Sequence, residues 1–377
     1  SASKEDLLDD FRNATETVET GLYSTVYKNA IGVYGGKPYG VICSTYDFGP
    51  GAEDVELLRS CASVAAMSHA PLLTNTNAGM FGKESFQEIP QLRDMESIFE
   101  HPRYAQWHAF RQSEDARYVG VCLPRFLLRA PYGSRESELS VRDFDFSEDV
   151  IDQHERYLWG PASVALTSRI ADAFARYRWC PNIIGPQAGG AVENLPLHQY
   201  HQDGEFKTKD PCEAPIEYRK EYEFAEQGFV SLIPKQGTNA AVFFSANSAQ
   251  KPKIFPATPE GLEAQRNFML GTRLPYMFVI TRLSHFLKAI VAEKIGKNIE
   301  RKDLEKELND WIRQYVSAME DPHPDIRAKR PLKGAEIQVE DVPGQIGWYR
   351  CNIKVRPHMK FEGASFELSL VGRLDNE

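Results

Sequence analysis

The sequence has few cysteines, and they lack the spacing of a metal or disulfide framework. Six cysteines stand at positions 43, 61, 122, 180, 212 and 351, with long irregular gaps and no CxxC pair. Zinc ribbons and fingers need such pairs, and disulfide scaffolds are short and rich in cysteine. We therefore expect reduced thiols, most of them in the core of a protein from a reducing compartment.

Long apolar runs and an excess of basic charge are absent as well. Runs such as 276–280 are far shorter than the ~20 residues that span a bilayer, and no charged segment followed by an apolar one opens the chain. Lys and Arg number 44 against 53 Asp and Glu, which gives a net charge of −9. This balance argues against a protein that coats nucleic acid. We expect a soluble, cytoplasmic chain without membrane insertion.

The chain does contain enough apolar residues for a sizeable core. Of its 377 residues, 42% are hydrophobic and 26% are charged, which is typical of globular proteins. At ~100–200 residues per domain, this length predicts two or three domains. A strand at 39–46, a helix that ends near residue 68 and a strand at 71–74 suggest a parallel crossover unit. The predicted fold class is therefore mixed α/β, with a first domain over 1–90.

The texture of the sequence changes between residues 91 and 210. Aromatic residues, prolines, glycines and acidic residues interrupt this stretch, which predicts a second, loop-rich domain over 91–210. A helix is expected over 161–178, with Val164 and Ala171 among its inward-facing residues. Residues 198–220 are polar and are predicted to be irregular.

The third part, residues 211–377, combines long helices with a C-terminal meander. Apolar stripes predict helices over 274–296 and 300–319. Beyond residue 335, apolar residues occupy every second position, which predicts antiparallel strands with one apolar face. Strands at a chain end leave edges that can pair with another chain. The residues expected to carry pairing between subunits are Tyr349, Cys351, Ile353, Val355, Phe366, Leu368 and Leu370.

Two short motifs point weakly to enzyme chemistry. Residues 248–251 match the S-x-x-K pattern of serine acyl-enzymes, but Pro252 would disrupt the helix that this pattern needs, and no K-T-G follows. The glycine-rich loop 185–190 resembles a phosphate-binding loop. It lacks the Lys and the Ser or Thr of a Walker motif, because Ala191 follows the last glycine. The favoured interpretation is a polar loop for residues 248–251 and a structural turn for residues 185–190.

A histidine pair is the other chemical candidate. His198 and His201, together with Asp203 and Cys212, are residue types that bind metals. Their spacing in a predicted loop would not by itself fix a tetrahedral site, so a solvated loop is favoured. An enzyme that depends on a metal or a nucleotide, and that uses 185–190 or the two histidines, is the remote alternative.

Two charged stretches near the C-terminus are candidates for docking a protein. Residues 300–313 carry both signs on a predicted helix, and residues 326–333 contain four basic residues and no acidic one. Such charged faces are usually just solvated. Because the chain is negative overall, a protein surface or plain solvation is favoured over contact with nucleic acid. The candidate contact charges are Lys302, Asp303, Glu305, Lys306, Asp310, Arg313, Arg327, Lys329 and Arg330.

Nine short segments, taken in order, resemble one known family over essentially the whole chain. The family is the large subunit of the type VI secretion contractile sheath, known as TssC or VipB. The segments are 22–27 (LYSTVY), 113–118 (SEDARY), 124–129 (PRFLLR), 157–160 (YLWG), 177–182 (YRWCPN), 250–253 (QKPK), 274–277 (LPYM), 311–316 (WIRQYV) and 355–358 (VRPH).

The resemblance implies a structural role, with no catalysis and no cofactor. The chain would pair with a small sheath subunit (TssB/VipA-like) and stack with copies of itself into a helical sheath around a tube of Hcp protein. The sheath would be attached to a baseplate at the envelope of a bacterium. Contraction would drive the tube and its spike into a target cell. The ClpV AAA+ ATPase would then dismantle the sheath, mainly through the small subunit.

The resemblance also gives the three parts of the chain their expected places. The family carries a further N-terminal segment ahead of the position of Ser1. Residues 1–90 would begin the α/β core of a tail-sheath-like protomer, 91–210 would form an outer insertion, and 211–377 would form the inner sheath domain. The C-terminal strands fall where the family shares a sheet between protomers. The charges of 300–313 and 327–333 become candidates for the face toward the tube.

One rival belongs to the same structural class. A phage-tail or extracellular contractile injection sheath would share the architecture, but it would assemble without a separate small subunit.

Overall fold

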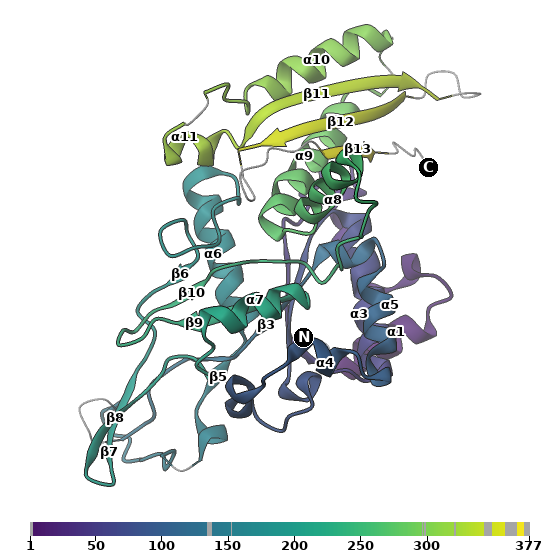
Figure 1. Cartoon of the computed structure of the whole chain (residues 1–377). Helices are drawn as coiled ribbons and strands as arrows, with labels where there is room; N and C mark the ends of the chain where they lie inside the picture. Colours follow the sequence, from purple (N-terminus) through teal and green to yellow (C-terminus); the bar gives the residue numbers. More distant parts are fainter. Residues whose placement is uncertain are drawn as a thin grey trace.

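The structure is a computed structural model, and it describes residues 3–133, 138–151, 153–295, 297, 299–319, 322–342, 349–358 and 368–372. Figure 1 shows a larger lobe built on a central sheet and a smaller lobe above it that contains α10, β11 and β12. The mixed α/β class expected from the sequence is confirmed.

A six-stranded sheet forms the centre of the larger lobe, in the order β1-β2-β3-β9-β10-β6. Its first four strands run parallel, and the two short strands at the other side are antiparallel. β2 and β3 are buried throughout, as expected of parallel strands that are covered on both faces. The strands are β1 (Ile42–Phe48), β2 (Leu72–Thr76), β3 (Val119–Leu123), β9 (Phe229–Pro234), β10 (Ala241–Phe243) and β6 (Ala191–Val192).

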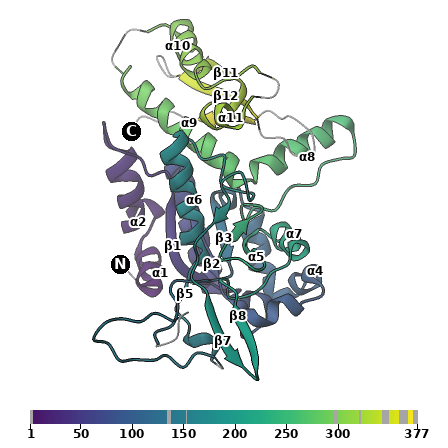
Figure 2. The same cartoon turned by 90° about the vertical axis from the view of Figure 1, so that its left-hand side faces the viewer.

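Helices cover both faces of this sheet (Figures 1 and 2). α3 (Ala52–Ser68) connects the parallel strands β1 and β2, so the predicted crossover unit is confirmed. α6 (Ala162–Tyr177) packs on the opposite face. Its burial was predicted only in part, because Val164 and Ala171 are exposed where inward positions were expected. The helix buries Ala165, Leu166, Ile170 and Ala173 instead.

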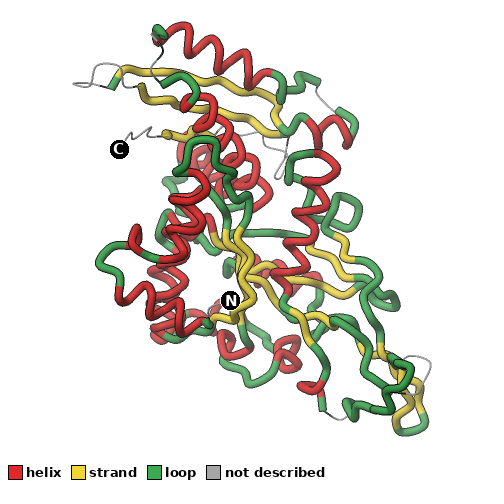
Figure 3. The backbone as a smooth tube through the Cα atoms, turned by 180° about the vertical axis from the view of Figure 1, so that it is seen from behind, coloured by secondary structure: helices red, strands yellow, loops and turns green. Residues whose placement is uncertain are grey.

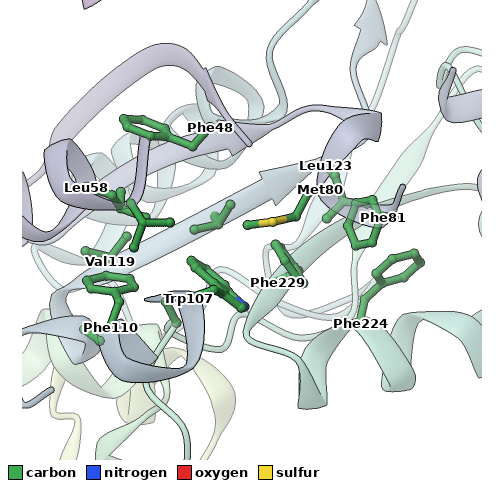
Figure 4. Close-up of a cluster of buried hydrophobic side chains, with 14 of the residues drawn as sticks. Phe48, Leu58, Met80, Phe81, Trp107, Phe110, Val119, Leu123, Phe224 and Phe229 are labelled. Atoms are coloured by element: carbon green, nitrogen blue, oxygen red, sulfur yellow. The ribbon is translucent and has the colours of Figure 1, made fainter. Parts of the chain in front are cut away.

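The core between α3 and the sheet is rich in aromatic rings (Figure 4). Trp107 lies on α5 (Ala105–Arg111) and stacks on Phe229 with the ring centroids 5.6 Å apart. Phe81 meets the edge of Phe224 at 5.2 Å. Offset and edge-to-face pairs of this kind add to the stabilisation that comes from burial alone. This cluster joins α5, α7 (Tyr218–Glu226) and strands of the sheet in one hydrophobic core.

A long insertion between β3 and β9 contains two small antiparallel sheets. β4 (Phe126–Leu127) pairs with β5 (Trp159–Gly160), and β7 (His198–Gln202) pairs with β8 (Glu205–Lys209). The prediction of irregular structure over 198–220 is therefore wrong. The hairpin β7–β8 turns at Asp203 and Gly204, which both have positive φ, as a two-residue turn of type I′ requires. Figure 3 shows the hairpin at the end of the molecule remote from the C-terminal lobe.

The smaller lobe packs helices on an antiparallel sheet of order β11-β12-β13. Its helix α9 is long and apolar enough to cross a membrane by length and composition. However, 61% of the 18-residue apolar window in this helix is buried inside the fold, as in the core helix of a globular protein. The elements are α8 (Pro259–Gly271), α9 (Leu274–Ala292), α10 (Arg301–Arg313), α11 (Pro324–Lys329), β11 (Leu332–Asp341), β12 (Tyr349–Pro357) and β13 (Leu368–Gly372).

A cation–π cluster joins the two lobes. The guanidinium of Arg282 on α9 lies 4.6 Å from the ring centroid of Phe174 on α6. It lies 5.5 Å from Trp179 and 4.8 Å from Phe286. Desolvation lowers the pKa of Arg282, yet the ring faces favour its charge. The cluster ties the C-terminal lobe to the helix that covers the central sheet.

Short helices complete the described fold. The central sheet takes two strands from each of the three predicted domains, 1–90, 91–210 and 211–377. The domain borders at 90 and 210 stay a prediction. The remaining elements are α1 (Lys4–Asn13), η1 (Thr17–Glu19), α2 (Gly21–Tyr23), η2 (Ser24–Ile31), η3 (Ala78–Phe81), η4 (Phe86–Gln91), α4 (Met95–Phe99), η5 (Pro102–Tyr104), η6 (Asp115–Tyr118) and η7 (His154–Arg156).

Candidate assembly interfaces

The C-terminal sheet has the single apolar face that its alternation predicts. Ile337 and Val339 on β11, and Ile353 and Val355 on β12, are at most 5% exposed. They belong to one core cluster with residues of α9 and α10. Cys351 is buried with them and Tyr349 is half-buried. The apolar face therefore holds the sheet to its own lobe.

The backbone of β12 is paired on both sides within the chain. Ile353 lies opposite Ile337 on β11 and opposite Leu370 on β13, and Val355 lies opposite Leu368. Phe366 lies outside the described residues. A strand from another subunit would therefore have to join at an outer strand or replace one. Pairing between subunits through this sheet stays a prediction.

The charges of α10 face two ways. Lys302, Asp303, Lys306, Asp310 and Arg313 are exposed. Asp310 and Arg313 form an ion pair at 2.9 Å that is open to solvent, and such pairs contribute only ~0–1 kcal/mol. They are thus free to exchange partners with an opposing surface.

Glu305 differs from these neighbours on α10. It is half-buried, and its Oε2 accepts a hydrogen bond of 2.9 Å from the backbone N–H of Val339. Its carboxylate is therefore engaged with the chain's own sheet rather than free to face a tube.

The basic charges after α10 lie at the other end of the same lobe. Arg327 is half-buried on α11, and Lys329 and Arg330 are exposed at its C-terminal end. Figure 1 places α11 at one end of β11 and β12, and α10 along the side of β11. The two charged stretches are thus parts of one lobe, and their contact with a tube stays a prediction.

The two histidines of the enzyme alternative do not form a metal site. They lie on β7 three residues apart, so their side chains point to opposite faces of the strand. His198 is buried, and its Nδ1 lies 2.8 Å from the Tyr157 hydroxyl. His201 is exposed and contacts the ring of Phe206. The hairpin separates the pair that the sequence placed together.

The glycine-rich loop is a tight turn fastened to β10. Gly190 N–H donates to Gly185 O at 2.9 Å, and Gly185 N–H donates to Phe243 O at 2.7 Å. Gly189 has φ +98°, and a Cβ there would lie 2.2 Å from Asn182 O. The strand β6 follows the loop, whereas a phosphate cradle needs a helix N-terminus at that point. The glycines serve the turn itself.

One group of possible metal ligands was missed by sequence reasoning. His154, Glu155 and Glu213 bring ligand atoms within 4.8 Å of one another. Arg125 already provides the cation there, because it binds both oxygens of Glu213 and also Glu155 Oε2 at 3.0 Å. Lys209 Nζ adds a second positive charge 2.8 Å from His154 Nδ1. The arrangement is an ion network at the base of the insertion, and its members come from three separate stretches of the sequence.

Glu213 is the buried centre of this network. Burial by itself raises the pKa of Glu213, but the hydrogen bonds and the charge of Arg125 outweigh that effect and hold the pKa below its ordinary value of 4.5. A lowered pKa means that the ionised form stabilises the fold. This contribution is complete above the unfolded-state pKa and is lost as the pH falls through the lower pKa of the folded state.

Replacing Glu213 with glutamine should therefore destabilise the fold in a pH-dependent way. At pH 7 we expect a loss of about 2–3 kcal/mol in the free energy of unfolding, less than for a fully buried pair because Arg125 keeps contact with water. The difference from wild type should shrink below pH 4.5. Urea unfolding at pH 7 and pH 3.5 measures it, with Glu155→Gln, at an exposed partner, as the control. An equal loss at both pH values would contradict this account.

Comparison with known proteins agrees with the architecture. Residues 1–250 match the EvpB/VC_A0108 tail sheath N-terminal domain family (VipB), and residues 263–374 match the tail sheath gpW/gp25-like domain of the same proteins. The type VI secretion system sheath protein TssC1 of Pseudomonas aeruginosa is 37% identical over 360 residues, which cover 94% of this chain and 71% of that protein. These matches favour a type VI sheath over the phage-tail or extracellular rival. The chain therefore belongs to the VipB family of type VI secretion tail sheath proteins and is a structural sheath subunit.

Proposed function

We propose that this subunit pairs with a small sheath subunit of the TssB/VipA kind and polymerises with copies of itself around an Hcp tube. The sheath would be assembled in the bacterial cytoplasm on a baseplate, and its contraction would propel the tube and spike into a target cell. The ClpV ATPase would recycle the contracted sheath through the small subunit. Family membership supports a structural role. The contacts with the small subunit, the Hcp tube, the baseplate and ClpV are what we propose.

The C-terminal sheet is the observation that carries the proposal. It is an antiparallel meander at the end of the chain whose strands run 10, 9 and 5 residues, long enough to take part in backbone pairing with another protomer. Such pairing uses main-chain groups, so it does not depend on one particular set of side-chain contacts. It would hold protomers together while the lattice changes shape.

The exposed charges of α10 support the proposed contact with the tube. A tube must be held before contraction and released during it, so the contact has to be weak at each site. Solvent-exposed ion pairs contribute ~0–1 kcal/mol and weaken with salt. Lys302, Asp303, Lys306, Asp310 and Arg313 fit this requirement because they are exposed and carry both signs.

Removal of residues 348–372 tests the role of the sheet. We expect a heterodimer with the small subunit that no longer forms tubes, because the deletion takes away β12 and β13 and leaves the central sheet of the larger lobe intact. Electron microscopy scores the tubes. Size-exclusion chromatography of the heterodimer separates loss of assembly from misfolding. Intact tubes from the truncated chain would rule out the proposed role of these strands.

A further inference from the structure

Arg282 on α9 carries a positive charge that no carboxylate of the described residues neutralises. Its side chain is half-buried where α9 meets the C-terminal end of α6 (Figure 2). Its Nε is buried and bonds to no residue that the structure describes. Its two Nη atoms form no hydrogen bond or ion pair with described residues either, and they keep contact with solvent. The N–H donors of this guanidinium group are therefore available to an acceptor.

Other half-buried arginines of the chain are paired within it. Arg129 binds both oxygens of Glu148 at 2.8 Å, and Arg169 Nη1 donates to Ala191 O at 2.9 Å. A donor that is withdrawn from water without an acceptor costs free energy. The unpaired Arg282 therefore suggests an acceptor from outside the single chain.

Aromatic rings hold Arg282 in one position. The guanidinium lies 4.6 Å from the ring centroid of Phe174, 4.8 Å from Phe286 and 5.5 Å from Trp179. Trp179 and Phe286 also contact each other, with ring centroids 6.4 Å apart. Ring faces stabilise a cation without neutralising it. The group is thus charged and preorganised, so little conformational entropy is lost when an anion binds.

A second arginine adds positive charge at the same place. Arg178 directly follows α6 and is exposed. Its guanidinium lies 5.7 Å from the ring centroid of Phe174, the ring that Arg282 also contacts. Desolvation lowers the pKa of Arg282, and the charge of Arg178 lowers it further. An anion between these two like charges would relieve their repulsion.

A protein carboxylate is the anion that best fits this site. It can accept two parallel hydrogen bonds from a planar guanidinium. The chain has 53 Asp and Glu residues and a net charge of −9, so a copy beside it presents many carboxylates. A free anion would bind weakly at a site that is partly open to water. A carboxylate on an adjoining copy is instead held at a high effective concentration by the rest of the contact.

We propose that Arg282 and Arg178 form a carboxylate-binding site, which an Asp or Glu side chain of a neighbouring copy of this chain occupies in the assembled sheath. This inference rests on the proposed function, since it requires copies that adjoin. Because Arg282 also joins the two lobes, a bound carboxylate would couple the junction between the lobes to the presence of a neighbour.

Carbodiimide cross-linking tests the proposal directly. The reagent joins a lysine amine to a carboxylate in contact with it, so the variant is Arg282→Lys, which keeps the positive charge. In tubes assembled with the small subunit, mass spectrometry should find the introduced lysine joined to an Asp or Glu of this chain. The same link should be absent from the unassembled subunit complex.

Arg176→Lys is the matched control for the cross-link. Arg176 is exposed nearby on α6 and pairs with Asp172 at 2.9 Å within its own helix, so its lysine should be joined to Asp172 in both states. For Arg282→Lys, a link to the small subunit, no link in tubes, or the same link before assembly would overturn the proposal and leave the sheath function intact. Absence of wild-type tubes would overturn the proposed function and this inference with it.

Removal of the charge gives a second readout. Arg282→Met keeps an unbranched side chain whose sulfur can contact the same rings, so the unassembled complex should unfold at a denaturant concentration close to that of wild type. Tube formation should need about tenfold more protein, because charge-assisted hydrogen bonds to a carboxylate are lost. Tubes at the wild-type protein concentration would overturn the proposal. If Arg282→Met does not fold, the cross-link from Arg282→Lys decides.

Discussion

Replacing Ile353 with aspartate is expected to abolish sheath assembly. Ile353 lies on the central strand β12, is 5% exposed and belongs to the core cluster shared with α9 and α10. A carboxylate at this position would be buried without a partner, a change among the most destabilising that a single residue can cause. We expect a loss of about 4 kcal/mol or more for the lobe, and no tubes.

Lys354→Asp is the matched control, because it introduces the same charge one residue further along β12. Lys354 is exposed on the opposite face of the strand, so tubes should still form. Hydrogen exchange across 349–358 should rise in the Ile353 variant and stay near wild type in the control. Tubes from the Ile353 variant, or equal loss from both variants, would contradict the view that this apolar face holds the sheet in place.

Replacing Arg111 with alanine is expected to destabilise the larger lobe by about 3–5 kcal/mol. Arg111 is 2% exposed, and its guanidinium donates to Ala249 O at 3.0 Å, Gln227 Oε1 at 3.0 Å and Glu226 O at 2.7 Å. Burial lowers its pKa to about 10, so the charge is retained at neutral pH. Alanine would leave three acceptors without their donor and a cavity beside them.

Chemical unfolding of the variant measures this loss. Arg176→Ala is the control, since its side chain is 65% exposed and bonds to Asp172 on its own helix. Arg111→Lys should recover part of the stability, because a lysine can donate to some of these acceptors but lacks the planar fork that reaches all three. A loss below ~1 kcal/mol for Arg111→Ala would show that the contacts are not structural.

Local patterns predicted the regular elements well. The helix that ends at residue 68, the strand beside it and the alternating C-terminal strands follow from hydrophobic periodicity, because each buries one face or stripe. Periodicity did not predict correctly which residues of α6 face the core. Val164 and Ala171 are apolar but exposed on α6, and small apolar residues carry little information about which side of a helix faces the core.

The hairpin β7–β8 escaped prediction because its strands are polar and lie at the surface. The signal was present, since Asp203-Gly204 is a favoured two-residue turn between two extended segments. The separation of His198 from His201 then follows directly from strand geometry.

Contacts between distant segments could not be predicted from one sequence. The network of Arg125, His154, Glu155 and Glu213 joins residues up to 88 positions apart. The role of Glu305 depends on the strand that lies beside α10. Its periodicity shows that it avoids the core, but water, a tube and a sheet edge are equally polar surroundings. The fold was therefore more predictable than its interfaces.

Electron microscopy of this protein co-expressed with its small sheath subunit would show whether the two chains build a contractile sheath. We predict hollow, ridged tubes that require both chains and that fail to form when Ile353 is replaced by aspartate. A monodisperse particle from the wild-type pair, with no tubes under any assembly condition, would contradict the claim that this chain is the large subunit of a contractile sheath.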